Sequence, residues 1–150
     1  ATATAATATA ATSPRSAGRL VRAGLLAGLI VNAIDIPSSA ALVSPAWTRF
    51  LANHGIAMNV PLVSAFYTTL HFLYGIALIA TYAVFRARFG AGTRTALYAT
   101  GLLLAIHRGF GAGMVAMGTM PLAIYLAFSA SMIAGSLIGG VVAARVYERA

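Results

Sequence analysis

The sequence predicts an all-α integral membrane protein built as a four-helix bundle, and three observations support this fold class. Hydrophobic residues make up 60% of the chain and charged residues only 8%, with a mean hydropathy of +0.87, well outside the usual range of soluble domains. The apolar residues gather in four stretches, each close to the roughly 20 residues that a helix needs to cross a bilayer. Arginines cluster at the ends of these stretches.

Each stretch defines one expected element, and 150 residues leave room for no domain outside the membrane. A tail is expected over residues 1–19, which begins with twelve residues of Ala and Thr only and ends with basic residues. The membrane domain then covers residues 20–150, with helices expected at 20–43, 60–85, 95–117 and 122–146. A cleaved signal peptide is the alternative for the first stretch. Because Asn32 and Asp35 interrupt the stretch where a cleavage site is expected, we interpret it as a retained helix.

The arginines predict the orientation. Eight of the ten lie at the start of the first helix, at the end of the fourth, or between the second and the third. Basic residues near helix ends stay on the cytoplasmic side, so both termini are expected inside, in a bacterial cytoplasmic membrane. Arg86, Arg88 and Arg94 are expected to anchor the inner loop to anionic headgroups. Trp47 is expected at the outer headgroup level, within the connection 44–59.

The net charge of +8 is typical of proteins that bind a polyanion. The topology accounts for this charge without nucleic acid, because the arginines lie where a membrane protein places them. Membrane lipids and other transmembrane subunits are therefore the expected partners. Cysteine is absent, which excludes disulfides and thiolate metal sites.

Small residues at a spacing of four predict where helices meet, because helices in lipid associate through close backbone contact. Two such faces lie on the third and fourth stretches: Gly101, Ala105, Gly109 and Gly113, and Ser131, Gly135, Gly139 and Ala143. A tight turn at Gly118–Pro121 makes these two helices antiparallel neighbours. We therefore expect the two faces to pack against each other.

Polar residues within the apolar stretches are the candidate functional residues, because hydrocarbon disfavours them strongly. They are Asn32, Asp35, His71, His107 and Arg108. The simplest interpretation is a buried ion pair between Asp35 and Arg108, with Asn32 or His107 completing its hydrogen bonds. A proton or ion relay along Asp35, His71 and His107 is the alternative.

The two buried histidines also allow a cofactor site. His71 and His107 lie at matching depth, about 15 Å from the outer helix ends at roughly 1.5 Å per residue. Two imidazoles from facing helices are a known arrangement for holding haem, and a (bacterio)chlorophyll contact is equally conceivable here. Against ligation, Tyr67 and Leu103 stand one turn before the two histidines, where a macrocycle needs small residues.

No catalytic pattern is recognised. Asp35 and Glu148 are the only acidic residues, and their different depths exclude a carboxylate pair for acid–base chemistry. The glycines around Gly111 alternate without a preceding strand, which excludes a nucleotide-binding loop. We therefore expect no enzymatic activity.

The segment from Arg86 to Gly92 reads Arg-x-Arg-Phe-Gly-x-Gly. It resembles the cytoplasmic loop of a group of small, uncharacterised bacterial four-helix membrane proteins, and the likeness extends to Asn32 and Asp35 in the first helix. The resemblance implies fold and location only.

These observations predict a non-catalytic accessory subunit that braces a helix interface in a larger bacterial membrane complex, with photosynthetic or respiratory assemblies as the expected hosts. The basis is the small size of the chain and the absence of reaction machinery. A small proton, ion or solute transporter that uses Asp35, His71 and His107 is the second hypothesis. A haem or pigment carrier is the third.

Overall fold

The computed structural model describes residues 14–149, and the expected Ala/Thr tail lies outside the described residues. The described elements are all helical: α1 (Pro14–Ser38), a π-helical segment η1 (Ser39–Val43), α2 (Ser44–Asn53), α3 (Val60–Phe89), α4 (Thr93–Ala116) and α5 (Leu122–Arg149). Four helical stretches among them are long and apolar enough to cross a membrane. This confirms the expected all-α class with four candidate spans and fits a multi-pass membrane protein.

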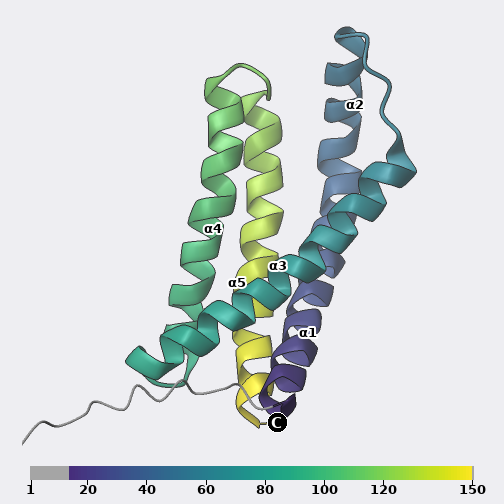
Figure 1. The fold of residues 1–150 in the computed structure, drawn as a ribbon. Helices are drawn as coiled ribbons and strands as arrows, with labels where there is room; N and C mark the ends of the chain where they lie inside the picture. The colour runs from purple at the N-terminus through teal and green to yellow at the C-terminus, as the bar shows by residue number, and fades with distance from the viewer. Residues whose placement is uncertain (1–13, 150) are drawn as a thin grey trace, which may run out of the picture.

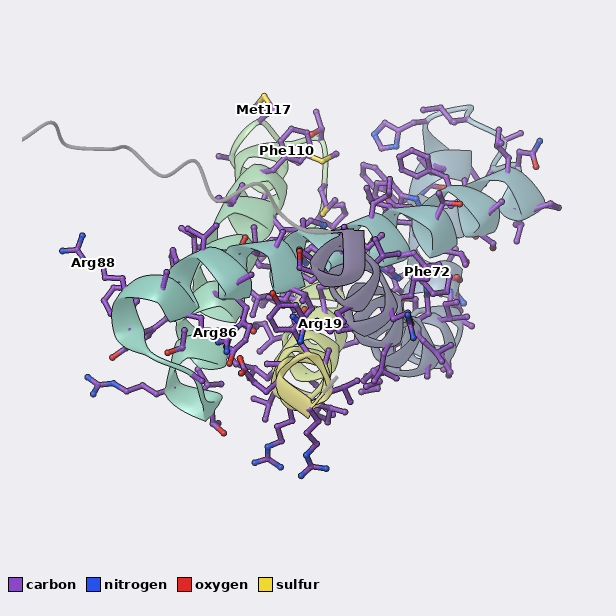
Figure 2. The ribbon with its side chains drawn as sticks, turned by 60° about the horizontal axis from the view of Figure 1, so that its bottom comes forward. Arg19, Phe72, Arg86, Arg88, Phe110 and Met117 are labelled. Carbon is purple, nitrogen blue, oxygen red and sulfur yellow. The ribbon has the colours of Figure 1, made fainter. Side chains whose placement is uncertain are left out.

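The helices run alternately up and down, so that the start of one lies beside the end of the next (Figure 1). The start of α1, the end of α5 and the turn between α3 and α4 share one end of the molecule. Figure 2 shows Arg19, Arg86 and Arg88 at this end, whereas Phe110 and Met117 lie toward the opposite one. We call the two the arginine-rich end and the distal end.

The first span is longer than the sequence predicts. The residues expected as the end of the tail begin α1, and the residues expected as a connection form α2, so that one rod runs over Ser16–Asn53, 38 residues. At about 1.5 Å per residue this rod is roughly 57 Å long, against roughly 30 Å for the bilayer core. The rod is therefore longer than a single crossing of the core requires, and none of the residues of α2, at its far end, is buried.

The rod continues through Pro37, a residue that normally ends or kinks a helix because it lacks a backbone N–H. Here the chain passes into the π turn of η1 instead of stopping. The Ser38 hydroxyl donates to the carbonyl of Ile34 at 2.7 Å, which satisfies a backbone acceptor beside the distortion. Such π turns often lie at functional sites, and Asp35 stands one helical turn before the start of this one.

The closest helix contact joins α1 and α3 through three glycines. A Cβ on Gly75 would collide with the backbone of Gly24 and Gly28, and one on Gly28 would lie 2.6 Å from the Cα of Phe72. Only glycine, whose side chain is a single hydrogen atom, allows the two backbones to approach this closely. The crossing fixes α3 against α1 and so sets the position of His71, one turn away.

The expected packing of α4 against α5 through their small faces is wrong for α4. A Cβ on Gly101, Gly109 or Gly113 would meet no atom within 4 Å, and Ala105 is exposed. The small face of α5 packs instead on α1, where a Cβ on Gly139 would lie 3.0 Å from the carbonyl oxygen of Ala27.

The remaining members of the α5 face, Ser131, Gly135 and Ala143, are buried as well. The helices α4 and α5 are antiparallel neighbours, as the tight turn predicts (Figure 1). They meet through other residues, with Gly140 of α5 against Thr100 of α4. The spacing of four thus identifies faces that can pack, and not the helix that each face packs on.

Candidate functional site

Among the described residues, two groups of polar side chains lie inside the helical assembly. The first, here the Asp35 cluster, is drawn from α1, η1, α3 and α5 and consists of Asn32, Asp35, Ser39, His71 and Ser131. The second, the Arg108 cluster, is drawn from α4 and α5 and consists of His107, Arg108, Tyr125 and Ser129.

Asp35 is almost completely shielded from solvent, with 3% of its surface exposed. Its Oδ1 atom accepts a hydrogen bond of 2.6 Å from the Ser131 hydroxyl, and its Oδ2 atom accepts one of 3.3 Å from Ser39. The Nε2 atom of His71 lies 3.8 Å from the same Oδ2. The carboxyl group is therefore held by two hydroxyls and faces an imidazole.

His71, also 3% exposed, is fixed from its other side. Its Nδ1 atom lies 2.8 Å from Oδ1 of Asn32, and the amide nitrogen of Asn32 donates to the Thr68 carbonyl at 3.3 Å. Asn32 and Asp35 are three residues apart on α1, a spacing that places both on one helix face. The two residues thus hold the ring from both nitrogens.

The Arg108 guanidinium is half-buried and contacts no carboxylate of the described residues. Its Nε and one Nη approach Nδ1 of His107 at 3.2 and 2.6 Å, and the other Nη donates to the Ser129 hydroxyl at 3.2 Å. The guanidinium also lies 5.9 Å from the centre of the Tyr125 ring. Tyr125 donates its hydroxyl proton to the backbone carbonyl of Arg108 at 3.1 Å, which ties α5 to α4 at this point.

The structure does not form the expected ion pair between Asp35 and Arg108. The two side chains point into different clusters and take neutral partners there. Asn32 and His107 do supply hydrogen bonds, as expected, but Asn32 supplies them to His71 and His107 to Arg108. The physical reason is that each charged side chain is already hydrogen-bonded to a serine hydroxyl of α5. Ser131 donates to Asp35, and Ser129 accepts from Arg108.

Each cluster borders a cavity. One of about 230 Å³ lies between the α1–α2 rod, α3 and α5, and is lined by Asp35, His71, Ser39 and Trp47 among others. The second, of about 370 Å³, lies between α3, α4 and α5, and is lined by His71, His107 and Arg108. Tyr67, His71 and Phe128 line both cavities, so His71 stands in the wall between them.

The contacts of His71 oppose the expected cofactor role, and those of His107 occupy one of its two ring nitrogens. Nδ1 of His71 is hydrogen-bonded to Asn32 and Nε2 faces Asp35, which leaves no ring nitrogen directed at a haem iron or a chlorophyll magnesium. His107 uses its Nδ1 atom as the acceptor for Arg108, and the Tyr74 ring lies 5.9 Å from its ring.

Arg86, one of the residues expected to anchor the chain to headgroups, pairs with a side chain of α5 instead. Its Nε lies 2.9 Å from a carboxylate oxygen of Glu148, and the same oxygen accepts a 2.8 Å hydrogen bond from Tyr82. The Tyr82 oxygen in turn accepts the backbone N–H of Gly92 at 3.1 Å. This network, which sequence analysis missed, ties the α3–α4 turn to α5.

The other expected anchors make contacts at or near their own helix ends. Arg94 donates to the hydroxyl of Tyr98 at 2.7 Å, and Arg88 lies over the Phe89 ring. Trp47 is half-buried on α2, stacks on Phe50 and borders the first cavity. The roles of Ser129 and Tyr125 were also missed, although both follow the distal turn on α5 at the depth of Arg108, which is the one signal that pointed to them.

No family model, curated protein or solved structure matches the chain. The resemblance of the segment Arg86 to Gly92 to a bacterial membrane-protein loop therefore stays a prediction, and the functional argument rests on the two clusters.

Proposed function

We propose that the chain is a small, non-catalytic membrane transport protein in which Asp35 and His71 together take up and release a proton. One observation carries the proposal: a buried carboxyl group and an imidazole face each other across 3.8 Å beside a cavity, and no arginine of the described residues forms an ion pair with the carboxyl group. Intramembrane acidic and histidine side chains in such surroundings are typical of proton and ion pathways.

The hydrogen bonds determine how many protons the site can hold. Because the Asn32 amide nitrogen donates to Thr68, its oxygen faces His71, and the network assigns a proton to Nδ1 of the ring. A neutral ring then turns the lone pair of Nε2 toward Asp35. An ionised Asp35 opposite that lone pair would be a buried, unpaired charge, which is costly. One additional proton, on Nε2 or on Asp35, removes this cost, and it is the proton that the site exchanges.

The surroundings offer a route to either end. The first cavity connects Asp35 and Ser39 with Trp47 of α2 at the distal end. One turn from His71 toward the arginine-rich end, the buried hydroxyls of Tyr74 and Ser136 face each other across α3 and α5. Buried hydroxyls of this kind usually bind ordered water, which would extend the polar path inward.

The membrane and the orientation belong to the same proposal. The arginine-rich end would face the cytoplasm of a bacterium, since basic residues are retained on that side. The first cavity and α2 would then lie on the outer side, and Tyr74 and Ser136 on the path toward the cytoplasm.

Proton flux into proteoliposomes tests the proposal. The protein is reconstituted with a trapped pH-sensitive dye, and a potassium gradient with valinomycin drives proton entry. We expect dye acidification above that of empty vesicles, and we expect Asp35→Asn and His71→Gln to remove it. His54→Gln is the matched control, because His54 is exposed near the end of α2 and borders neither cavity. Wild-type flux equal to that of empty vesicles would refute the proposal, as would full flux through Asp35→Asn.

A second candidate function is the accessory subunit that braces a helix interface in a larger bacterial complex, of photosynthetic or respiratory type. The observation that favours it is the open face of α4, where Gly101, Gly109 and Gly113 meet no other part of the described chain. Such a face suits another transmembrane helix. Native mass spectrometry of the protein extracted from its own membrane in mild detergent tests this candidate: a stoichiometric partner is expected, and a bare monomer would contradict it.

A further inference from the structure

The Arg108 cluster contains a positive charge that this chain does not neutralise. Only two acidic residues exist in the whole sequence. Glu148 pairs with Arg86 at the arginine-rich end, and Asp35 is held by Ser131 and Ser39. No acidic side chain therefore remains for Arg108.

Arg108 is also too deep in its helix to be treated as an end residue. Eight positions separate it from Ala116, where α4 ends, which places it about 12 Å along the axis at roughly 1.5 Å per residue. Charged residues at such depth are normally paired or directed into a polar cavity. A guanidinium carries five N–H donors, and His107 and Ser129 use only some of them.

The cavity beside Arg108 is apolar away from the guanidinium. Its volume is about 370 Å³, near the lower limit of roughly 300–1,000 Å³ for sites that hold small molecules. Apolar side chains from α3, α4, the distal turn and α5 line it, among them Phe66, Leu70, Ile106, Phe110, Met120 and Met132. One alkyl chain fits such a volume better than two.

The rim of this cavity lies on the outer surface of the helices. Phe66 of α3 is 60% exposed, and Ile106 and Phe110 of α4 are 64% and 77% exposed. Figure 2 shows Phe110 projecting away from the helices. In a bilayer this surface meets acyl chains, so an amphiphile can enter from the membrane with its head toward Arg108.

From the unpaired guanidinium and the apolar cavity together, we infer a binding site for a single-chain anionic amphiphile. Its carboxylate would accept hydrogen bonds from the free N–H groups of Arg108, a geometry that suits the planar guanidinium. Its alkyl chain would lie among the apolar residues between α3 and α4. His107 accepts from Arg108 through Nδ1, so its ring proton is on Nε2, a second donor beside the cavity. The site does not depend on proton exchange at Asp35. The inference is therefore independent of the proposed function, and each can fail without the other.

Binding of dodecanoate to the whole protein in a non-ionic detergent tests the inference, measured by isothermal titration calorimetry at pH 8. We expect saturable binding of dodecanoate and much weaker binding of dodecan-1-ol, which has the same chain without the charge. Arg108→Gln should weaken dodecanoate binding by about tenfold or more, the value of one charged hydrogen-bonded contact, and Arg108→Lys should retain most of it. Arg49→Gln, an exposed arginine of α2, is the matched control and should bind like wild type.

A second variant tests the same site if Arg108→Gln does not fold. Met114→Trp leaves Arg108 in place and narrows the apolar part of the cavity, and we expect it to lose dodecanoate binding as well. Equal affinity of wild type and Arg108→Gln would overturn the inference, and so would equal binding of dodecanoate and dodecan-1-ol. Arg108-dependent binding of phosphatidylglycerol without any binding of dodecanoate would overturn the assignment to a single-chain ligand.

Discussion

At the scale of single residues, the decisive feature is that each buried charge has neutral partners. Asp35 accepts from two serine hydroxyls and faces His71, whereas Arg108 donates to His107 and Ser129. Hydroxyl donors satisfy a carboxylate without neutralising it, and in the proposed function the adjacent imidazole shares the exchanged proton with it. A direct pair between Asp35 and Arg108 would have fixed both charges and removed any exchange of protons.

A double-mutant cycle distinguishes these two arrangements. Asp35→Asn and His71→Gln should couple by about 0.5–3 kcal/mol in the free energy of unfolding, because the two side chains share one network. Asp35→Asn and Arg108→Gln should be additive within about 0.5 kcal/mol, as expected for side chains that are not in contact. Unfolding by SDS in mixed micelles gives the free energies. Strong coupling of Asp35 with Arg108, together with no coupling of Asp35 with His71, would instead support the ion pair between Asp35 and Arg108 that the sequence predicts.

At the scale of the helices, α1 is the central element. It contacts α3 on one side through Gly24 and Gly28, and α5 on another through Ala27 and Val31. The Asp35 cluster lies where these three helices meet, since it draws its side chains from all of them. The position of the carboxyl group relative to the imidazole is therefore fixed by the glycine crossing.

Substitution of two glycines by the same residue, alanine, should affect stability differently. Gly75→Ala places a Cβ against the backbone of Gly24 and Gly28, and overpacking of this kind costs about 1–3 kcal/mol. Gly101→Ala meets no neighbour and should be neutral or stabilise by up to about 1 kcal/mol, the helix preference of Ala over Gly. Thermal midpoints in one detergent compare them. A loss of stability in Gly101→Ala equal to that in Gly75→Ala would mean that α4 has a partner on its open face.

At the scale of the whole molecule, hydropathy was enough to find the four spans, because lipid demands long apolar helices whatever their packing. It did not find the length of the first rod, since Pro37 and Pro45 look like the end of a helix and the π turn that carries the chain past them depends on local hydrogen bonds.

The partners of the functional residues were harder to predict than the residues themselves. All five polar candidates, Asn32, Asp35, His71, His107 and Arg108, line the cavities or join the two clusters. Their pairing was missed because charge alone favours Asp35 with Arg108, whereas the rotation of each helix decides which side chains meet. That rotation is set by contacts such as Gly75 against Gly28, which a pattern of small residues on several helices does not specify.

The length of the first rod gives the topology a sharp test. The chain has no cysteine, so single cysteines can be placed at Ala91, in the turn between α3 and α4, and at Ala52, near the end of α2; both positions are exposed. We expect an impermeant thiol reagent to label Ala91→Cys only from the cytoplasmic side and Ala52→Cys only from outside, because the proposed orientation places the end of α2 beyond the bilayer core on the outer side. Leu73→Cys, in the middle of α3 and 58% exposed, is the control and should stay unlabelled from both sides, since lipid covers it. Labelling of Ala91→Cys and Ala52→Cys from the same side would contradict the four-span arrangement, and an unreactive Ala52→Cys would mean that α2 lies within the membrane.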